Sequence, residues 1–247
     1  MKKIKTAKDQ SVTVLVAAAG SGARMGGVYK PLEMLCGKPV ICYSLELFEK
    51  NPRVKSVVIA AREDKTEEIK ELCEKYGYTK VKDTVCGGKD RQESVKNAFC
   101  AAFQVPEDIT KLVAVHDAAR PLVTSEELCR VFDTAYTFGA SSCACRVRDS
   151  VKRTDIADVI TEDVDRENLW LMQTPQVFDT DIYHTALSNA QKLGISATDD
   201  CAVVTAAGFK VVLCETSSAN IKLTYPEDMF LAGAILRRRE TGEEMNK

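Results

Sequence analysis

Short, continuously apolar runs alternate along the chain with longer segments in which apolar residues recur every three or four positions. The run at residues 12–18 is rich in β-branched residues and ends before Gly20, which predicts a buried strand. Segment 66–76 gathers its apolar residues on one side and is followed by Gly77, which predicts an amphipathic helix. Strands are predicted at residues 12–18, 54–61, 81–85, 112–115, 209–214 and 221–223. Helices are predicted at residues 66–76, 126–138, 180–193, 199–207 and 226–238, and two more at Pro39 and near Val95.

This order of elements indicates the fold class. Strands that alternate with helices favour a doubly wound α/β fold, in which a mostly parallel, Rossmann-like sheet carries helices on both faces. The chain has no linker-like stretch, internal repeat or low-complexity segment. We therefore expect residues 1–247 to form a single domain.

One segment departs from the pattern. In residues 146–165 apolar residues alternate sparsely with charged ones, and residues 154–158 suit a turn, so we predict a β-hairpin arm within residues 146–170. An isolated two-stranded hairpin is marginally stable in water, so the arm needs a surface to lie on. We expect that surface to belong to a partner subunit, which would make the protein a homodimer. The alternative is a flap over its own domain.

The composition excludes some partners. Lys and Arg number 34 against 36 Asp and Glu, giving a formal charge of -2, whereas a protein that binds nucleic acid through its phosphates usually carries a basic excess. No apolar run approaches the roughly 18 residues that a membrane-spanning helix needs. The basic N-terminus is not followed by the apolar run of a signal peptide. We expect a soluble, cytoplasmic protein that binds neither membrane nor nucleic acid.

The ten cysteines need a separate explanation. There is no Cys-x-x-Cys pair, and the closest spacing is that of Cys143 and Cys145. Most of the cysteines lie in apolar stretches, and only two histidines are present to complete a zinc site. We expect reduced thiols that serve mostly as small buried apolar residues.

Candidate chemistry begins after the first predicted strand. Residues 17–27 read Ala-Ala-Ala-Gly-Ser-Gly-Ala-Arg-Met-Gly-Gly, and glycines at the carboxyl end of a first parallel strand let backbone N–H groups approach a phosphate. A dinucleotide fingerprint would need a third glycine where Met25 stands, and the Gly-Lys-Ser/Thr of a Walker A loop is absent. Two cations, Arg24 and Lys30, lie close to the glycines instead. Fixed cations beside such a loop suit group transfer at phosphorus.

Later motifs carry a resemblance to a known family. In order they are AAAGSGARMG with KP, GGKDRQESV from Gly87, HDAARP from His116, RDSVKR from Arg148, VDRENLW from Val164, TPQVF from Thr174 and NIKLT from Asn220. The first resembles the signature of nucleotidyltransferases. Together, over roughly residues 11–236, they closely resemble the 2-C-methyl-D-erythritol 4-phosphate cytidylyltransferase family of the non-mevalonate isoprenoid pathway.

The resemblance implies how CTP is bound. Backbone of Ala18, Ala19 and Gly20 would contact the nucleotide. The segment with Gly87, Gly88 and Ser94 would read the cytosine. Many family members carry an acidic residue after this glycine pair, where this chain has Lys89, so we expect base contacts there to come from the backbone.

The resemblance also implies roles in transfer. Arg24 and Lys30 would stabilise the transition state together with Mg²⁺. Asp117 ends a predicted buried strand at the ligand edge of the sheet, where a carboxylate suits either Mg²⁺ or a substrate hydroxyl. Arg120 would help to hold the acceptor. The neighbouring His116 points to the opposite face of the strand, and we expect it to be a core histidine.

Three more residues are implied at the acceptor. Arg166 and Lys222 would position the attacking phosphate, and Arg166 and Ser150, on the predicted arm, would act across the dimer interface. Ser150 keeps the hydroxyl of the threonine common in the family. Ala219 stands where many members have aspartate, which argues against a metal site built from two aspartates.

We therefore predict transfer of CMP from CTP to 2-C-methyl-D-erythritol 4-phosphate, which gives 4-diphosphocytidyl-2-C-methyl-D-erythritol and pyrophosphate. The nearest alternative is a ribitol 5-phosphate cytidylyltransferase, which shares the loop and the chemistry. Alternatives from other classes are a nicotinamide-dependent dehydrogenase and a nucleotide-binding module without catalytic activity.

Overall fold

A seven-stranded sheet forms the centre of the protein. The computed structural model describes residues 10–20, 22, 26–105 and 109–241. The strands of the sheet lie in the order β11-β7-β10-β6-β1-β4-β5. They are β1 (Val12–Ala17), β4 (Val54–Ala61), β5 (Val81–Cys86), β6 (Leu112–Asp117), β7 (Ala140–Arg146), β10 (Trp170–Asp179) and β11 (Val212–Glu215). Strand β10 runs antiparallel to β6 and β7, and the other pairings are parallel, which confirms the predicted fold class.

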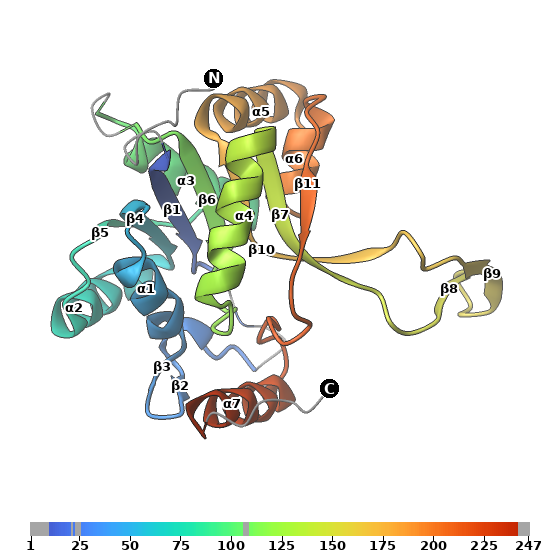
Figure 1. Cartoon of the computed structure of the whole chain (residues 1–247), viewed down its shortest axis with the longest axis horizontal. Coiled ribbons are helices and arrows are strands. Elements are labelled where there is room, and N and C mark those ends of the chain that lie inside the picture. Colours follow the sequence, from blue (N-terminus) through green and yellow to red (C-terminus); the bar gives the residue numbers. More distant parts are fainter. Residues whose placement is uncertain (1–9, 21, 23–25, 106–108, 242–247) are drawn as a thin grey trace, which may run out of the picture.

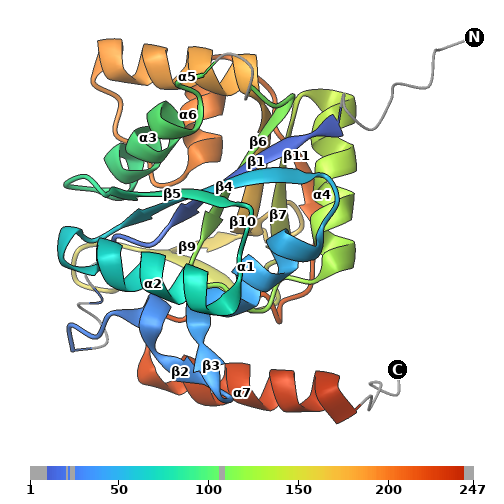
Figure 2. The same cartoon turned by 90° about the vertical axis from the view of Figure 1, so that its left-hand side faces the viewer.

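Helices cover both faces of this sheet (Figures 1 and 2). They are α1 (Val40–Lys50), α2 (Thr66–Tyr76), α3 (Arg91–Ala102), α4 (Ser125–Phe138), α5 (Thr180–Leu193), α6 (Asp200–Ala206) and α7 (Pro226–Thr241). Val14 and Val16 of β1 pack in the apolar cluster of α1, α2 and α4, whereas Leu15 packs in that of α3, α5 and α6. The alternation of side chains along a strand therefore builds two apolar cores from one strand.

Helix α7 packs on a smaller unit below the sheet (Figure 1). Two short strands, β2 (Met34–Leu35) and β3 (Lys38–Pro39), pair as a hairpin, and Leu35, Val40 and Leu122 form an apolar cluster with Leu236 of α7. Among the described residues no helix is long and apolar enough to cross a membrane.

The structure corrects several sequence predictions. The predicted strand at 221–223 is irregular chain, and the strand predicted at 209–214 is β11, which begins only at Val212. Strands β7 and β10 were not predicted, because β7 is built from small residues and β10 contains Pro175, which normally argues against a strand. The sheet register of β10 is irregular between Met172 and Gln176, where that proline lies.

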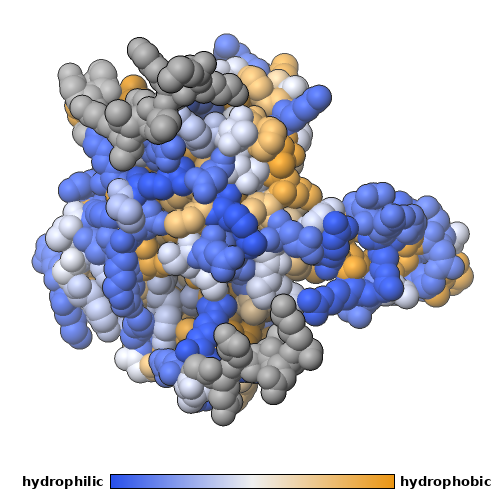
Figure 3. All heavy atoms as spheres, in the orientation of Figure 1, coloured by the Kyte–Doolittle hydropathy of each residue, from blue (hydrophilic) through white to orange (hydrophobic). Residues whose placement is uncertain are grey.

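The arm is present as a hairpin of β8 (Val151–Thr154) and β9 (Ile160–Val164). It extends away from the body of the protein, so it is not a flap over its own domain (Figure 1). The apolar side chains at its tip are exposed: Ile156 is fully exposed, and Val159 and Ile160 are exposed by 59% and 60%. Figure 3 shows this apolar surface at the end of the arm, among charged residues.

All ten cysteines are free, and six of them are buried, which agrees with the prediction of mostly buried thiols. Cys36, Cys86 and Cys100 are exposed and are exceptions to it. Among the described residues, no group of three or more His, Cys, Asp or Glu side chains is arranged to hold a metal ion.

Candidate active site

A cavity of about 420 Å³ opens at the carboxyl ends of β1 and β6. Open α/β sheets bind ligands at this edge. The cavity lies beside the loop after β1 and the start of α3. Eight of the residues singled out in the sequence line it: Ala18, Ala19, Gly20, Lys30, Gly88, Ser94, Asp117 and Lys222. Arg24 lies outside the described residues.

The two glycine loops of the cavity approach each other closely. Gly87 N–H donates to the carbonyl of Ala61 at 2.7 Å, and Gly88 N–H donates to the hydroxyl of Ser94 at 2.9 Å. A Cβ atom on Gly87 would lie 2.3 Å from the Cβ of Ala19, a distance that real side chains do not tolerate. Glycine at this position therefore lets the segment predicted to read the base pack directly against the loop after β1.

Asp117, at the end of β6, is the centre of a charged cluster. Its Oδ1 atom accepts from Arg91 Nε at 3.1 Å and its Oδ2 atom from Lys222 Nζ at 2.7 Å. Arg120 Nε lies 4.0 Å from Oδ2. Burial alone would raise the pKa of this carboxyl group, but Arg91, Lys222 and Arg120 together hold it well below its ordinary value. Asp117 is therefore ionised and surrounded by positive charge.

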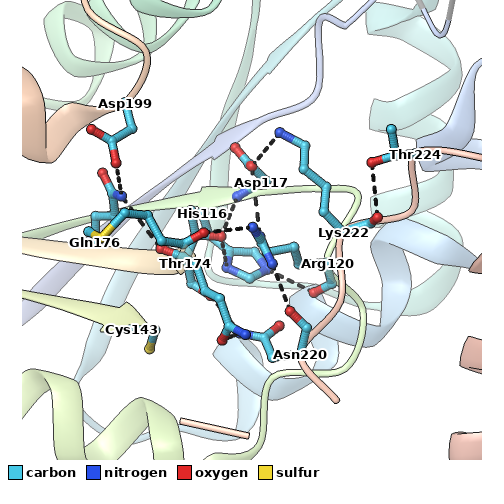
Figure 4. Close-up of polar contacts among 12 residues, drawn as sticks. His116, Asp117, Arg120, Cys143, Thr174, Gln176, Asp199, Asn220, Lys222 and Thr224 are labelled. Carbon is cyan, nitrogen blue, oxygen red and sulfur yellow. Dashed lines mark hydrogen bonds and ion pairs between the residues drawn. The ribbon is translucent and has the colours of Figure 1, made fainter. Parts of the chain in front are cut away.

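Lys222 reaches Asp117 from irregular chain (Figure 4). The backbone before it is fixed by Asn220, which is fully buried and donates through Nδ2 to the Thr174 carbonyl at 2.9 Å. The Asn220 carbonyl accepts from Arg120 Nη1 at 2.7 Å. These side-chain hydrogen bonds, together with one backbone bond from the Leu223 N–H to the Ala119 carbonyl at 2.8 Å, hold the segment in place of the strand that we predicted. Arg120 lies between Asp117 and the loop that it helps to hold.

His116 is fully buried, as predicted for a core histidine. Its Nε2 atom is 3.1 Å from the Arg120 carbonyl, which can only accept, so Nε2 carries the proton. Thr174, which the sequence analysis did not single out, then donates its hydroxyl hydrogen to Nδ1 at 3.1 Å and accepts from the Asp117 N–H at 3.0 Å. This chain of hydrogen bonds fixes the backbone of Asp117 (Figure 4).

Burial of His116 makes a testable contribution to acid stability. Burial lowers its pKa from 6.5 to about 4 in the folded protein, so on acidification the unfolded chain binds the proton first. The contribution of the neutral His116 to the free energy of unfolding is fully present above pH 6.5, and it is lost as the pH falls towards 4. Between pH 7 and pH 4 the free energy of unfolding should fall by up to about 3 kcal/mol more in the wild type than in His116→Gln.

Chemical denaturation at a series of pH values measures this difference. His184→Gln is the matched control, because it removes the other histidine of the chain, which is exposed. A His116→Gln profile parallel to that of the wild type would show that the pKa of His116 is not depressed.

Arg91 is the main residue of the cavity that the sequence analysis missed. It lines the cavity, and besides Asp117 it contacts Asp200, whose Oδ2 atom accepts from Nη1 at 2.7 Å. One signal was available in the sequence. A cation in the first turn of a helix opposes the helix dipole, so an arginine directly after the helix cap Asp90 needs carboxylate partners.

Lys30 and the two predicted residues of the arm differ in their relation to the cavity. Lys30 opens the short 3₁₀ helix η3 (Lys30–Leu32) and faces the cavity. Ser150 and Arg166 are exposed at the base of the arm, and neither lines the cavity of its own chain. Arg166 donates through Nη1 to the backbone carbonyl of Arg148. Their predicted roles therefore depend on a second subunit.

The donor set suits one divalent cation that arrives with a nucleotide. Two carboxylates line the cavity. Asp90 caps α3 by accepting from the Glu93 N–H, whereas Asp117 lies with Arg91, Lys30 and Lys222 and is ionised. Mg²⁺ in phosphate-transfer sites is commonly held by one or two carboxylates together with substrate oxygens and water, so a single aspartate fits that arrangement. No cluster able to bind a metal without substrate exists in the described ranges.

The fold and the cavity define a class. A mostly parallel sheet, a glycine-rich loop after its first strand and cations gathered at its carboxyl edge are features of an α/β nucleotidyltransferase. A sequence model of the 2-C-methyl-D-erythritol 4-phosphate cytidylyltransferase family matches residues 12–238, and the chain belongs to this family. The family is one of enzymes, which excludes the dehydrogenase and the non-catalytic module considered above.

Individual relatives agree with this assignment. The chain is 37% identical over 235 residues to 2-C-methyl-D-erythritol 4-phosphate cytidylyltransferase of Alkaliphilus metalliredigens, with 94% of this chain and 96% of that protein covered. It is 38% identical over 229 residues to the enzyme of the same name from Halalkalibacterium halodurans, covering 92% and 98%. The crystal structure of the Thermus thermophilus enzyme of that name matches with a TM-score of 0.75 at 29% identity, covering 92% and 99%.

Proposed function

We propose that the cavity binds CTP and 2-C-methyl-D-erythritol 4-phosphate and transfers CMP from the first to the second. The gathering of Lys30, Arg91 and Lys222 in one cavity around Asp117 carries this proposal. The charged residues that line the cavity are Lys30, Lys89, Arg91 and Lys222 against Asp90 and Asp117, and this excess of positive charge suits a triphosphate and a phosphate monoester. The family activity of CTP-dependent cytidylyl transfer to this acceptor, in isoprenoid biosynthesis, agrees with it.

The reaction needs positioning and charge stabilisation more than proton transfer. A phosphate monoester has its second pKa near 6, so at neutral pH an oxygen of the acceptor is already ionised. That oxygen forms a bond to the α-phosphorus of CTP while the bond to the bridging oxygen of the β-phosphate breaks, and pyrophosphate leaves. No general base is required. Charge that gathers on the phosphoryl oxygens is stabilised by fixed cations.

The predicted residues divide between the two substrates. Lys30 and Arg24 would stabilise the transferring phosphoryl group. Lys222 pairs with Asp117 in the free protein, and it would leave this carboxylate to bind and orient the attacking phosphate. Backbone groups of Ala18, Ala19 and Gly20 would contact the nucleotide. Those of Gly87 and Gly88, with Ser94, would contact the base. Arg120, which braces the Asn220 loop, would help to hold the acceptor.

We infer that the divalent metal is Mg²⁺ and that Asp117 is its protein ligand. When bound with CTP, Mg²⁺ would neutralise charge on the phosphate oxygens. The contribution of the chain is to keep Asp117 ionised and to fix its backbone through Thr174. Ala219 offers no second carboxylate, so Asp117 would be the single aspartate ligand of the metal.

We place the enzyme in the cytoplasm.

We further propose that the chain acts as one domain with an arm, and that two copies form a homodimer through that arm. The exposed apolar residues of its tip support this, because a second subunit would cover them. In such a dimer Ser150 and Arg166 would complete the acceptor site of the partner, since neither lines the cavity of its own chain.

Complementation between two inactive variants tests the shared site. Lys30→Ala damages the cavity itself, and Arg166→Ala damages the arm that serves the other cavity. If the site is shared, a mixed dimer has one cavity with both defects and one with neither. Random exchange of subunits should then restore about a quarter of the wild-type activity, because half of the dimers regain one of two sites.

Pyrophosphate release after co-refolding the two variants measures the recovery. Each variant co-refolded with itself is the control. Activity that stays at the level of the separate variants, although mixed dimers form, would contradict a site shared through the arm. A fully active monomer in sedimentation would contradict it as well.

A steady-state assay tests the function itself. Pyrophosphate should be released from CTP only when 2-C-methyl-D-erythritol 4-phosphate is present, and a divalent cation should be required. Release without the acceptor, or no release with it, would contradict the proposed reaction.

A further inference from the structure

Arg91 connects the cavity to the buried carboxylate of Asp200, the first residue of α6. Its guanidinium contacts Asp117 Oδ1 through Nε at 3.1 Å and Asp200 Oδ2 through Nη1 at 2.7 Å. The other oxygen of Asp200 accepts from the hydroxyl of Tyr183 at 2.5 Å. Asp200 is only 1% exposed, and Tyr183 is fully buried. A continuous set of polar contacts therefore runs from the apolar core to the carboxylate of the active site.

Tyr183 gives this set a rigid end. Its ring stacks on Phe178 of β10 with centroids 4.9 Å apart and meets Phe99 of α3 edge to face at 5.5 Å. These aromatic residues belong to the apolar cluster that joins α3, α5 and α6 to the sheet. A tyrosine fixed in this way holds its hydroxyl, and so the Asp200 carboxylate, in one place.

The two carboxylates stabilise the positive charge of Arg91 between them. Arg91 stands in the first turn of α3, where both burial and the helix dipole disfavour a cation. Burial lowers the pKa of Arg91, but Asp200 and then Asp117 more than offset this, and the net pKa is raised. Arg91 is thus held between two carboxylates, one buried in the core and one at the cavity.

Capping of α6 does not account for Asp200. The neighbouring Asp199 is the cap of that helix, and it accepts from the Ala202 N–H at 2.9 Å and from Gln176 Nε2 at 2.9 Å. The side chain of Asp200 instead contacts Arg91 and Tyr183. A buried carboxylate destabilises the folded protein unless it is paired with a cation. The ion pair with Arg91 therefore explains why an aspartate is present at position 200.

We infer that Arg91, Asp200 and Tyr183 form a brace that orients the Asp117 carboxylate for the cytidylyl transfer proposed above. The brace holds Oδ1 of Asp117 from the side of α3, and Oδ2 then faces Lys222 at 2.7 Å. Asp200 and Tyr183 are positioning residues, since they act on the site through Arg91. Loss of the Asp200 contact leaves Lys30 and Lys222 in the cavity but frees the Arg91 guanidinium, and with it the Oδ1 side of the Asp117 carboxylate.

Asp200→Asn tests the brace, because it keeps the size of the side chain and an acceptor for Tyr183 while removing the charge that holds Arg91. We expect kcat to fall about tenfold, with the KM for CTP changing less than threefold, because misplaced catalytic groups affect turnover more than binding. In the background of Asp117→Asn the same substitution should change kcat less than twofold, since the group that the brace orients is then already altered.

A matched control separates this from a general loss of stability. Asp133→Asn breaks another arginine–aspartate pair, in which Arg53 Nη1 lies 2.5 Å from the exposed carboxylate of Asp133 outside the cavity. This variant should keep the wild-type kcat. Arg91→Lys leaves a cation beside Asp200. It should also lower kcat about tenfold, and this effect should disappear in the Asp117→Asn background. If Asp200→Asn does not fold, Arg91→Lys tests the brace in its place.

Equal losses in both backgrounds would show a structural role and overturn the brace. A folded Asp200→Asn variant with the wild-type kcat would overturn it too. An inactive wild-type protein would overturn the proposed function and the brace with it. An active wild type with unaffected brace variants would overturn the brace alone.

Discussion

Turnover of CTP is expected to fall by about 10² to 10³ when Lys30 is replaced by alanine, because removing one fixed donor from a charge-stabilising site typically has an effect of this size. Lys30 opens η3 directly before the buried Pro31 and faces the same cavity as Asp117 and Lys222. Its ammonium group is therefore placed where negative charge would gather during transfer.

Single-turnover release of pyrophosphate from CTP measures this effect without interference from product release. Lys70→Ala is a suitable control, since Lys70 lies on α2 outside the cavity and pairs with Glu67. Circular dichroism should show that both variants are folded. A folded Lys30→Ala variant with nearly normal turnover would exclude Lys30 from the reaction.

Asp117→Asn is expected to separate turnover from binding. Turnover with Mg²⁺ should fall by about 10² or more, because a metal ligand that supplies several kcal/mol of charge stabilisation is lost. Binding of CTP without Mg²⁺ should become tighter by about tenfold, which corresponds to about 1.4 kcal/mol. The reason is that Lys222 no longer pairs with a carboxylate and Arg91 pairs with Asp200 alone, so both cations are freer to contact phosphate.

Calorimetric titration with CTP in the presence of a chelator gives the affinity, and the pyrophosphate assay gives the turnover. Weaker binding of CTP without metal would show that Asp117 does not compete with the triphosphate for these cations. Unchanged turnover with Mg²⁺ would exclude Asp117 as the metal ligand.

The fold could be predicted where local signals are strong. The helix at 66–76 was predicted, although its cap is Lys65 and not Thr66, and Gly77 ends it in a left-handed conformation as expected. The strand at 54–61 was also correct. Strands β7 and β10 were missed because sheet pairing, which a local pattern does not reveal, outweighs the small residues of one and the proline of the other.

The candidate site could be predicted in part for a similar reason. A glycine-rich loop and a carboxylate at strand ends are placed together by the topology of a parallel sheet, so the cavity around Lys30 and Asp117 was expected. The contact between Arg91 and Asp200 joins residues 109 positions apart, and that between His116 and Thr174 joins residues 58 positions apart. Such pairs depend on packing of whole elements, which the motifs alone do not specify.

The identity of the acceptor is the most direct test of the account. Purified protein should be given CTP, Mg²⁺ and, in separate reactions, 2-C-methyl-D-erythritol 4-phosphate or ribitol 5-phosphate, with pyrophosphate release and product mass recorded. We predict formation of 4-diphosphocytidyl-2-C-methyl-D-erythritol and a kcat/KM that strongly favours the methylerythritol acceptor. Equal or better use of ribitol 5-phosphate, or no cytidylylated product from either, would contradict the account.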